Sequence, residues 1–389
     1  MLIKNKYQAF TIIALLSLPL IGSAQMVQNM LVGKGLKNEE KVFLKNIAQD
    51  VEYICLETTD KCLIGGAGHM FTTDADNIII ADNVFYRFGR DGKYKNSISS
   101  RGKGPGEYLE ICGFEIDPAT GTFFIFDRQG KILNFKLTGE LISDQKVSSG
   151  LYANLFDKNK VINLYSSRSS FLSGGYRVVI NDLKGSPVMK VMKLDQESIN
   201  GNQNLTVQNT RLTNFRDSTT VWEGLCDTIY RISKDYQINP RFCLDLGKDR
   251  LPKTLPITPN SPDYRKEIDK YIMPIKFFET DRQLYLDTSD RGQPKRHLCN
   301  KSNGVCITLP SDDLIINDFD GGPDFWPLGI TPDGKLYMLF DIVVLKEYWK
   351  PNTEIALKYP EKQKAFLKML ESCKADDNPI IMLVTPIKN

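Results

Sequence analysis

The chain has 389 residues, of which 41% are hydrophobic and 25% are charged. Its 50 lysine and arginine residues against 47 aspartate and glutamate residues leave a formal net charge of +3, and no basic run is dense enough to follow a phosphate backbone, which excludes nucleic acid as the expected partner. The length exceeds that of a usual single domain, but all-β repeat folds grow by adding units around one axis, so we expect one large domain.

The first 24 residues have the pattern of a secretory signal peptide. Lys4 and Lys6 give a positive start, residues 9–21 form an apolar stretch, and Ala24 ends a small-residue cleavage site. We therefore expect a mature chain that begins at Gln25 and is periplasmic or secreted. The apolar stretch is too short to span a bilayer and no other stretch qualifies, so the mature protein is predicted to lack a transmembrane segment. An uncleaved anchor is the alternative interpretation.

Two strands at opposite ends of the mature chain have no repeat unit of their own. Residues 25–50 are polar and predict an N-terminal arm, whereas residues 51–57 (VEYICLE) alternate as a strand does. Residues 380–384 (IIMLV) follow Pro379 and predict a second strand. Propellers commonly pair their terminal strands within one blade, which removes an open sheet edge, and we expect that pairing here.

The region between these strands repeats a unit of strand, turn, strand, turn and strand. Self-similarity at about 40 residues with four short strands per period indicates β-propeller blades. Six apolar strand cores begin at Asn77, Thr122, Lys160, Thr219, Gln283 and Lys335, each after a turn rich in Asp or Gly. The sequence therefore predicts an all-β, six-bladed β-propeller with four-stranded antiparallel blades over residues 51–389. A two-sheet sandwich is the competing fold, and it is usually far smaller.

Two insertions in the repeat predict short helices. Pro262 suits the first position of a helix over residues 263–272. A second helix begins at Pro360 and carries Phe366 and Leu370 on one face. We expect both apolar faces to cover blade edges, and the alternative is that one of them is a docking surface.

Eight cysteines in an exported chain allow disulfides. Cys299 and Cys306 flank a turn-rich loop, and Cys226 and Cys243 flank a second hairpin, so each pair would lie opposite across its hairpin. The alternative is that these are small apolar residues buried in strands. Four further cysteines have no evident partner: Cys55, Cys62, Cys112 and Cys373. No CxxC spacing is present, so a zinc site is not predicted.

The leading candidate for a binding site is the loop over residues 101–108 (RGKGPGEY). Its glycines allow close approach of the backbone, and Arg101, Lys103, Glu107 and Tyr108 can present charge and an aromatic face. Because the loop joins the outer strand of one blade to the inner strand of the next, we expect it on the rim of the axial channel. The alternative is a structural crossover in which Glu107 and Tyr108 bond the neighbouring blade.

A second candidate loop leads into the last unit over residues 318–326 (DFDGGPDFW). Its three carboxylates with glycines have the ligand type of a hard cation such as Ca²⁺, although their spacing matches no standard calcium loop. An acidic turn is the alternative interpretation. Trp326 can stack on a sugar ring or pack between blades. Asp324 and Trp326 complete the predicted ligand-binding set.

His69 and His297 are the only histidines. Neither a GxSxG nor an HExxH motif is present, and no nucleophile or metal set lies near either residue in the sequence. We therefore expect structurally bonded histidines and predict no catalytic residue, no metal and no cofactor.

The order of these features over residues 51–388 resembles a secreted bacterial six-bladed β-propeller family related to NHL-repeat propellers. The resemblance is carried by VEYICLETT at 51–59, RFGRDGK at 87–93, RGKGPGEY at 101–108 and DDNPI at 376–380. The chain differs from the family pattern in having Cys55 where proline is usual and in lacking a lipidation cysteine. The resemblance implies the fold and an exported location, and it implies no reaction.

Together these features favour an exported binding and scaffolding propeller that recognises a glycan, a peptide or a protein partner at the channel rim. The alternative is a Ca²⁺-dependent hydrolase or lyase acting on a lactone or an anionic polysaccharide, which requires carboxylates of several blades to converge on the axis. A third hypothesis is a structural component of an envelope complex.

Overall fold

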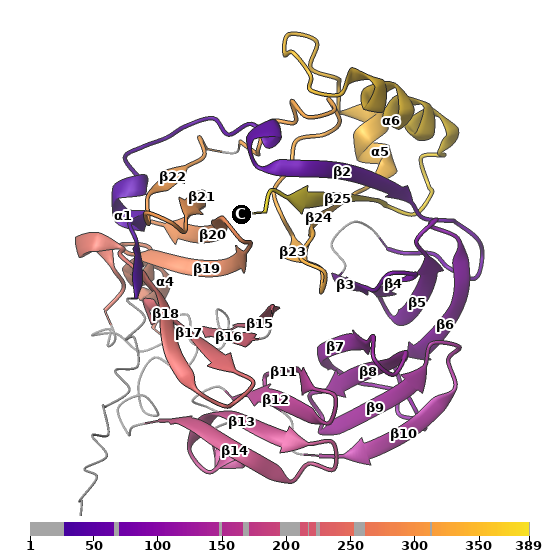
Figure 1. The fold of residues 1–389 in the computed structure, drawn as a ribbon, viewed down its shortest axis with the longest axis vertical. Coiled ribbons are helices and arrows are strands. Elements are labelled where there is room, and N and C mark those ends of the chain that lie inside the picture. The colour runs from indigo at the N-terminus through magenta and orange to yellow at the C-terminus, as the bar shows by residue number, and fades with distance from the viewer. Residues whose placement is uncertain are drawn as a thin grey trace, which may run out of the picture.

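The structure is a computed structural model that describes residues 27–65, 70–147, 150–165, 171–194, 211–216, 218–222, 226–252, 261–311 and 313–388. The predicted signal peptide and His69 lie outside these residues. Six sheets surround a common centre, with β3, β7, β11, β15, β19 and β23 as their innermost strands (Figure 1). The predicted six-bladed β-propeller is confirmed.

The blades are numbered in chain order, and their strands are given from the innermost outward. Blade 1 contains β3 (Met70–Thr73), β4 (Asn77–Ala81), β5 (Val84–Gly89) and β6 (Tyr94–Ser100). Blade 2 contains β7 (Ile111–Asp117), β8 (Thr122–Asp127), β9 (Lys131–Lys136) and β10 (Leu141–Lys146). Blade 3 contains β11 (Tyr152–Asp157), β12 (Lys160–Leu164), β13 (Tyr176–Asp182) and β14 (Pro187–Lys193).

The second half of the ring follows the same order. Blade 4 contains β15 (Arg211–Phe215), β16 (Ser218–Trp222), β17 (Thr228–Ser233) and β18 (Ile238–Leu244). Blade 5 contains β19 (Ile272–Glu279), β20 (Gln283–Asp290), β21 (Gln293–Asn300) and β22 (Cys306–Thr308). Blade 6 contains β23 (Gly329–Ile330), β24 (Leu336–Phe340), β25 (Ile380–Pro386) and β2 (Ala48–Cys55).

Each apolar core found in the sequence forms the second strand of its blade. This position lies between two antiparallel neighbours and between two adjoining blades, so it is covered on every side. The strand β4, with the sequence NIIIA, is buried at all five positions. A strand covered on both faces shows a continuous apolar run instead of alternation, which explains why these six segments stand out in the sequence.

The ring closes where the predicted terminal strands meet. β2 pairs antiparallel with β25, with Val51 opposite Val384 and Cys55 opposite Ile380. Val51 and Val384 are buried in the same apolar cluster. The predicted closure by N- and C-terminal strands is therefore confirmed.

The segment before β2 runs along the outside of blades 4 and 5. It contains β1 (Gln28–Met30), α1 (Val32–Gly35) and the 3₁₀ turn η1 (Leu44–Asn46). β1 adds to the outer edge of blade 4 by parallel pairing with β18. The Leu31 amide donates to the Gly304 carbonyl of blade 5 at 2.8 Å. The side chains of Met30 and Val32 are buried, so this segment covers two blades before the chain reaches blade 6.

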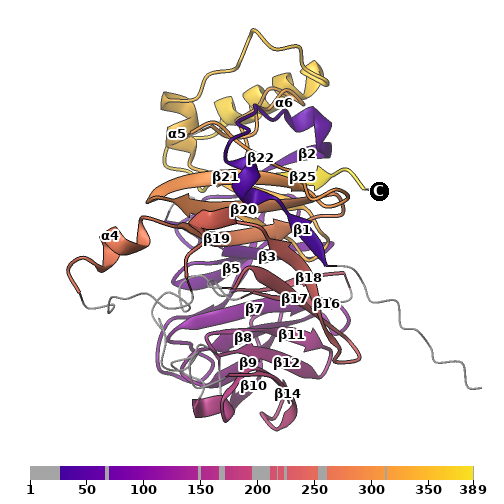
Figure 2. The same cartoon turned by 90° about the vertical axis from the view of Figure 1, so that its left-hand side faces the viewer.

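The helices lie outside the ring. α4 (Tyr264–Ile268) precedes β19, η3 (Gly247–Asp249) is a short 3₁₀ turn, and α5 (Ile342–Glu347) and α6 (Pro360–Ser372) separate β24 from β25. α5 and α6 lie together at the end of the molecule formed by blade 6 (Figure 2). Their buried side chains, Leu345 and Phe366 among them, pack with Ile380, so this insertion covers the closing blade as expected.

Two details differ from the prediction. The helix predicted over residues 263–272 ends at Ile268, because Ile272 already begins β19. α5 was not predicted, since only Ile342 and Leu345 are buried in its six residues and so short a pattern carries little periodicity. None of the helices in the described part of the chain is long and apolar enough to cross a membrane.

The two predicted cysteine pairs have different outcomes. Cys299 and Cys306 form a disulfide across β21 and β22, as predicted. Cys226 and Cys243 are not joined, because the hairpin pairs Ile232 with Ile238 and a bulge between Ile229 and Tyr230 shifts the register further, so that Thr228 faces Cys243. That part of the prediction is wrong.

Candidate functional site

The centre of the ring contains a cavity of about 750 Å³. Residues of all six innermost strands line it, so the site is a product of the closed ring rather than of one blade. Its polar lining includes Thr72, Glu115, Asn154, Thr213, Asn214 and Lys234. Its apolar lining includes Met70, Phe114, Tyr152, Phe277, Phe278 and Leu328. A small-molecule site of this kind has mostly apolar walls with a few convergent polar groups.

Glu115 is the most perturbed carboxyl group of the lining. Its two oxygens accept from the Leu155 amide at 3.1 Å and from Asn214 Nδ2 at 3.4 Å, so one side chain of β7 bonds both β11 and β15. Burial raises the pKa of Glu115 from 4.5 to about 7, against the opposing effects of these two donors and of Lys234. The group can therefore accept or donate a hydrogen bond at neutral pH.

Gly113 allows this bond. β7 and β11 approach so closely at this point that a Cβ on Gly113 would lie 1.8 Å from the Ala153 carbonyl oxygen. Only a residue without a side chain leaves room for the neighbouring strand. The approach brings Glu115 within reach of the Leu155 amide, two residues further along β11.

The apolar lining includes two large side chains that remain accessible inside the ring. Met70 is 56% exposed and Leu328 is 39% exposed, although both line the cavity. Tyr152 and Phe278 add partly buried aromatic surface. Solvent-accessible apolar surface in a concave site favours a ligand with an apolar or ring-shaped face.

Lys276 connects the cavity to one of the predicted site residues. Its ammonium group lies 3.3 Å from Asp287 Oδ2 and 5.4 Å from the centre of the Phe278 ring. Asp287 Oδ1 accepts from Trp326 Nε1 at 2.7 Å. Burial raises the pKa of Asp287, against the effects of Lys276 and Trp326. Trp326 is itself buried and packs edge-on against Tyr285, so it holds Asp287, the partner of the cavity-lining Lys276, in place.

The loop over residues 101–108 folds on itself. The Glu107 carboxylate accepts from the Gly104 amide at 2.6 Å and occupies the space beside Gly102. Tyr108 is buried, and its hydroxyl donates to the carbonyls of Asp82 and Asn83 at 3.0 Å each. Burial raises the pKa of the Tyr108 hydroxyl to about 12.

The alternative, in which Glu107 and Tyr108 bond the neighbouring blade, agrees with the contacts of Tyr108, whereas the Glu107 carboxylate bonds its own loop. Arg101 and Lys103 are exposed on the same loop. Only Gly106 of its three glycines has a positive φ, at 71°.

Each carboxylate of the acidic loop over residues 318–326 bonds another residue of the chain. Asp318 is buried, and its two oxygens accept from the Lys45 amide and pair with the Lys45 ammonium group, both at 2.9 Å. Asp320 accepts from the Tyr53 hydroxyl at 3.0 Å, and Asp324 accepts from the Asn317 amide at 2.8 Å. In the described ranges no group of three His, Cys, Asp or Glu side chains is arranged to hold a metal ion.

None of the six predicted binding residues (Arg101, Lys103, Glu107, Tyr108, Asp324 and Trp326) lines the axial cavity. The structure places four of them on the blade 1 to blade 2 crossover and two on the blade 5 to blade 6 crossover, and it does not bring the two groups together at the cavity wall. Their predicted role in binding stays a prediction.

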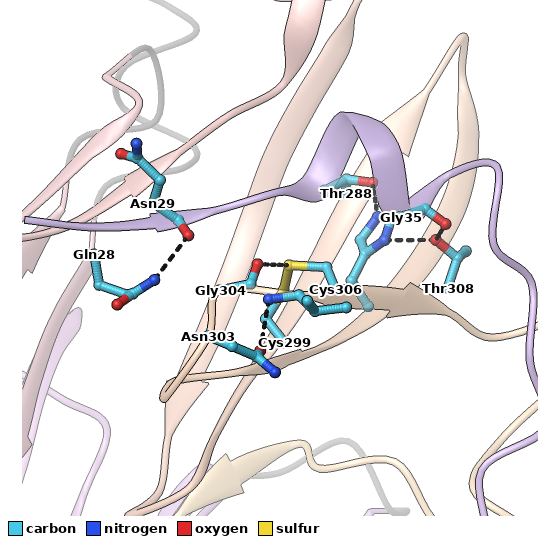
Figure 3. The surroundings of a disulfide bond; sticks show 11 residues. Gln28, Asn29, Gly35, Thr288, Cys299, Asn303, Gly304, Cys306 and Thr308 are labelled. Atoms are coloured by element: carbon cyan, nitrogen blue, oxygen red, sulfur yellow. Dashed lines mark hydrogen bonds between the residues drawn. A yellow bond between two sulfur atoms is a disulfide. The ribbon is translucent and has the colours of Figure 1, made fainter.

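His297 is bonded on both ring nitrogens inside blade 5. Nε2 lies 2.8 Å from the Thr288 hydroxyl and Nδ1 lies 2.9 Å from the Thr308 hydroxyl, which donates to the Gly35 carbonyl at 2.8 Å. Thr308 therefore accepts from Nδ1. Burial lowers the pKa of His297 to about 4. Figure 3 shows Gly35 of α1 above Thr308, beside the Cys299–Cys306 disulfide, so this network attaches the N-terminal segment to blade 5.

The sequence reasoning missed Glu115, Asn154 and Asn214. Each of these residues lies in the segment directly before one of the six apolar cores, which is where a propeller places its innermost strand. A polar residue within such a segment was the available signal. Whether such a residue belongs to a site depends on its partners in neighbouring blades, which are about 40 residues apart in sequence.

A closed ring of six four-stranded blades around a lined axial cavity places the protein in the class of six-bladed β-propellers. A model of the family described as "Domain of unknown function (DUF4934)" matches residues 28–385, and the chain belongs to this family. The resemblance to a bacterial six-bladed propeller family is thereby confirmed. Among curated proteins, none matches the sequence.

The chain is similar to several solved structures. A Bacteroides fragilis protein described as a candidate exported protein aligns with a TM-score of 0.66 and 17% identity over 93% of this chain and 100% of that chain. A member of the DUF4221 family from Bacteroides vulgatus aligns at 0.48 and 9% identity over 88% and 98%. Virginiamycin B lyase from Staphylococcus aureus aligns at 0.41 and 11% identity over 86% and 99%. At 17% identity the likeness to the Bacteroides fragilis protein shows the fold alone, and the other two, with TM-scores of 0.48 and 0.41, carry no argument.

Proposed function

We propose that this protein is an exported binding propeller that takes a short glycan or peptide segment into its axial cavity. The observation that carries the proposal is the cavity itself, because its volume of about 750 Å³ falls within the range of about 300–1,000 Å³ that is usual for small-ligand sites. Export is supported by the signal pattern of residues 1–24 and by the description of the similar Bacteroides fragilis protein as a candidate exported protein.

The lining favours a ligand that has both hydrogen-bonding groups and an apolar face. Asn154, Asn214 and Glu115 offer amide and carboxyl groups at the wall, while Tyr152 and Phe278 offer ring surface. Sugar rings and peptide units combine such groups, and aromatic side chains bind the less polar face of each. A rigid ring with these groups fixed on its inner strands binds without a large ordering cost.

The experiment is a binding screen of the full chain on glycan and peptide arrays, with hits measured by calorimetry. Leu328→Trp should narrow the cavity, because Leu328 lines the wall and its side chain is accessible there. Val188→Trp, on the outermost strand of blade 3, is the matched control because Val188 is equally an exposed apolar residue but does not line the cavity. We expect Leu328→Trp to weaken binding at least tenfold and Val188→Trp to leave it unchanged. Arrays without any hit, or equal binding by both variants, would contradict the proposal.

The calcium-dependent alternative needs carboxylates of several blades to converge. The cavity wall contains Glu115, Asp117 and Asp157, but Asp117 bonds the Ala119 amide and Thr120 of its own turn, and Asp157 pairs with Lys160 at 2.6 Å. No observation in the described part of the chain favours this alternative, and it remains a hypothesis.

A further inference from the structure

Two cysteines that have no partner in the sequence pattern meet at the closure of the ring. Cys55 is the last residue of β2, and Cys373 directly follows α6. Their Sγ atoms lie 3.1 Å apart although 318 residues separate them in sequence. This distance is shorter than an ordinary contact between two sulfur atoms.

The surroundings hold both sulfur atoms in place. Cys373 is only 6% exposed and packs with Phe366 and Leu370 of α6. Its backbone amide donates to the Leu370 carbonyl, and its thiol donates to the Met369 carbonyl at 3.3 Å. Cys55 is fixed from the other side by its pairing with Ile380 on β25. A bond of about 2.05 Å requires the sulfur atoms to approach by about 1 Å, which side-chain rotation can supply.

We propose that Cys55 and Cys373 form a second disulfide, a covalent clasp that locks the closing blade of the propeller. The loop that this bond encloses contains blades 1 to 5 and the two inner strands of blade 6, β23 and β24. Without it, β2 is held only by non-covalent contacts, which are its backbone hydrogen bonds to β25, its packing, and side-chain bonds such as that of Tyr53 to Asp320. With it, β2 stays attached to the α5–α6 insertion even when its pairing with β25 opens.

The reaction is a thiol–disulfide exchange with a disulfide donor, either a small-molecule disulfide or a disulfide oxidoreductase. One protein thiolate attacks a donor sulfur, forms a mixed disulfide and expels the first donor thiolate. The second protein thiolate attacks the protein sulfur of that mixed disulfide and expels the second donor thiolate. The two protein thiols lose two protons and two electrons, and the donor disulfide is reduced to two thiols.

Access favours Cys55 as the first thiol to react, since it is half-buried and Cys373 is buried. Burial and the contact with Cys373 raise the pKa of Cys55 to about 12, with a small further rise from Asp377 and a small opposing effect of Lys93. A thiol with so little thiolate at neutral pH exchanges slowly in the folded protein. The bond therefore forms most readily while the chain folds.

The test is a peptide map of the full chain after refolding from denaturant in oxidised glutathione at about pH 8.5, near the ordinary thiol pKa, because the bond forms most readily during folding. The sample is denatured in N-ethylmaleimide, digested without reductant and analysed by mass spectrometry. We expect a linked pair of peptides containing Cys55 and Cys373, two hydrogen masses below their sum, that disappears with dithiothreitol. The Cys299–Cys306 link serves as the internal control. Alkylation of both Cys55 and Cys373 in a sample that contains this control link, or a link from either to another cysteine, would overturn the proposal.

A second readout measures what the bond does. Refolding under oxidising conditions should raise the Tm of the wild type by several degrees more than the Tm of Cys55→Ser and Cys373→Ser, in which the Cys299–Cys306 link can still form. Cys243→Ser is the matched control, because Cys243 is not in a disulfide and lies in blade 4, and it should respond as the wild type does. An equal response of all four proteins would overturn the clasp. If a serine variant fails to fold, the peptide map of the wild type decides alone.

Discussion

Replacing Gly113 with alanine should open the cavity wall between blades 2 and 3. The added Cβ would lie 1.8 Å from the Ala153 oxygen and 2.9 Å from its carbonyl carbon, so β7 and β11 must separate by about 1.5 Å to reach ordinary contact. That movement breaks the 3.1 Å bond between the Leu155 amide and Glu115. Strain of this kind costs about 1–3 kcal/mol, and loss of a bond to a carboxylate costs about 1.5–3 kcal/mol.

The expected total for Gly113→Ala is therefore about 2.5–6 kcal/mol, or a fall in Tm of roughly 5–12 °C at about 2 °C per kcal/mol for a chain of this size. Differential scanning calorimetry measures it. Gly65→Ala is the matched control, because its Cβ would meet nothing closer than Asp82 Oδ2 at 3.9 Å. A Gly113→Ala protein that melts with the wild type would refute the close approach of β7 and β11 and, with it, the placement of Glu115.

Further outcomes follow from single side chains. The raised pKa of Glu115 means that stability is lost as pH rises from 4.5 to about 7, and Glu115→Gln should remove this loss. The lowered pKa of His297 means that stability is lost as pH falls from 6.5 to about 4, and His297→Gln should remove that loss. Relative to the wild type, the urea midpoints of the two variants should therefore change in opposite directions with pH. Changes in the same direction would contradict both assignments. Trp326→Phe should lower the free energy of unfolding by about 1–3 kcal/mol because it leaves Asp287 Oδ1 without its donor, while Lys276 stays at Oδ2. Arg101→Ala should change the free energy of unfolding by less than about 0.5 kcal/mol. Equal urea midpoints of the two variants would contradict the packing role of Trp326.

Much of the fold was predictable because the second strand of every blade is buried on all sides. Such strands as β4 and β8 consist almost wholly of apolar residues, and turns rich in Asp or Gly mark their starts. The closing strands β2 and β25 stood out as strands without a unit. α5 and β1 escaped prediction because elements of six and three residues carry too little periodicity to be recognised.

The site was harder to predict because it is made between blades. Glu115 has its partners on β11 and β15, so its role depends on two strands that are distant in sequence. The loop over residues 101–108 attracted attention through its glycines and charges, yet its acid is occupied by its own backbone. Cys55 and Cys373 likewise meet only after the ring has closed. Local sequence patterns identify the strands, whereas contacts between residues far apart in sequence determine the environment of Glu115 and bring Cys55 to Cys373.

Hydrogen–deuterium exchange of the full chain with a ligand from the arrays tests the central claim most directly, since it reports where that ligand binds. Binding in the axial cavity predicts slower exchange in the peptides of β7, β11 and β15. Slower exchange confined to residues 101–108 and 318–326 would contradict the cavity as the site and return the function to the crossover loops.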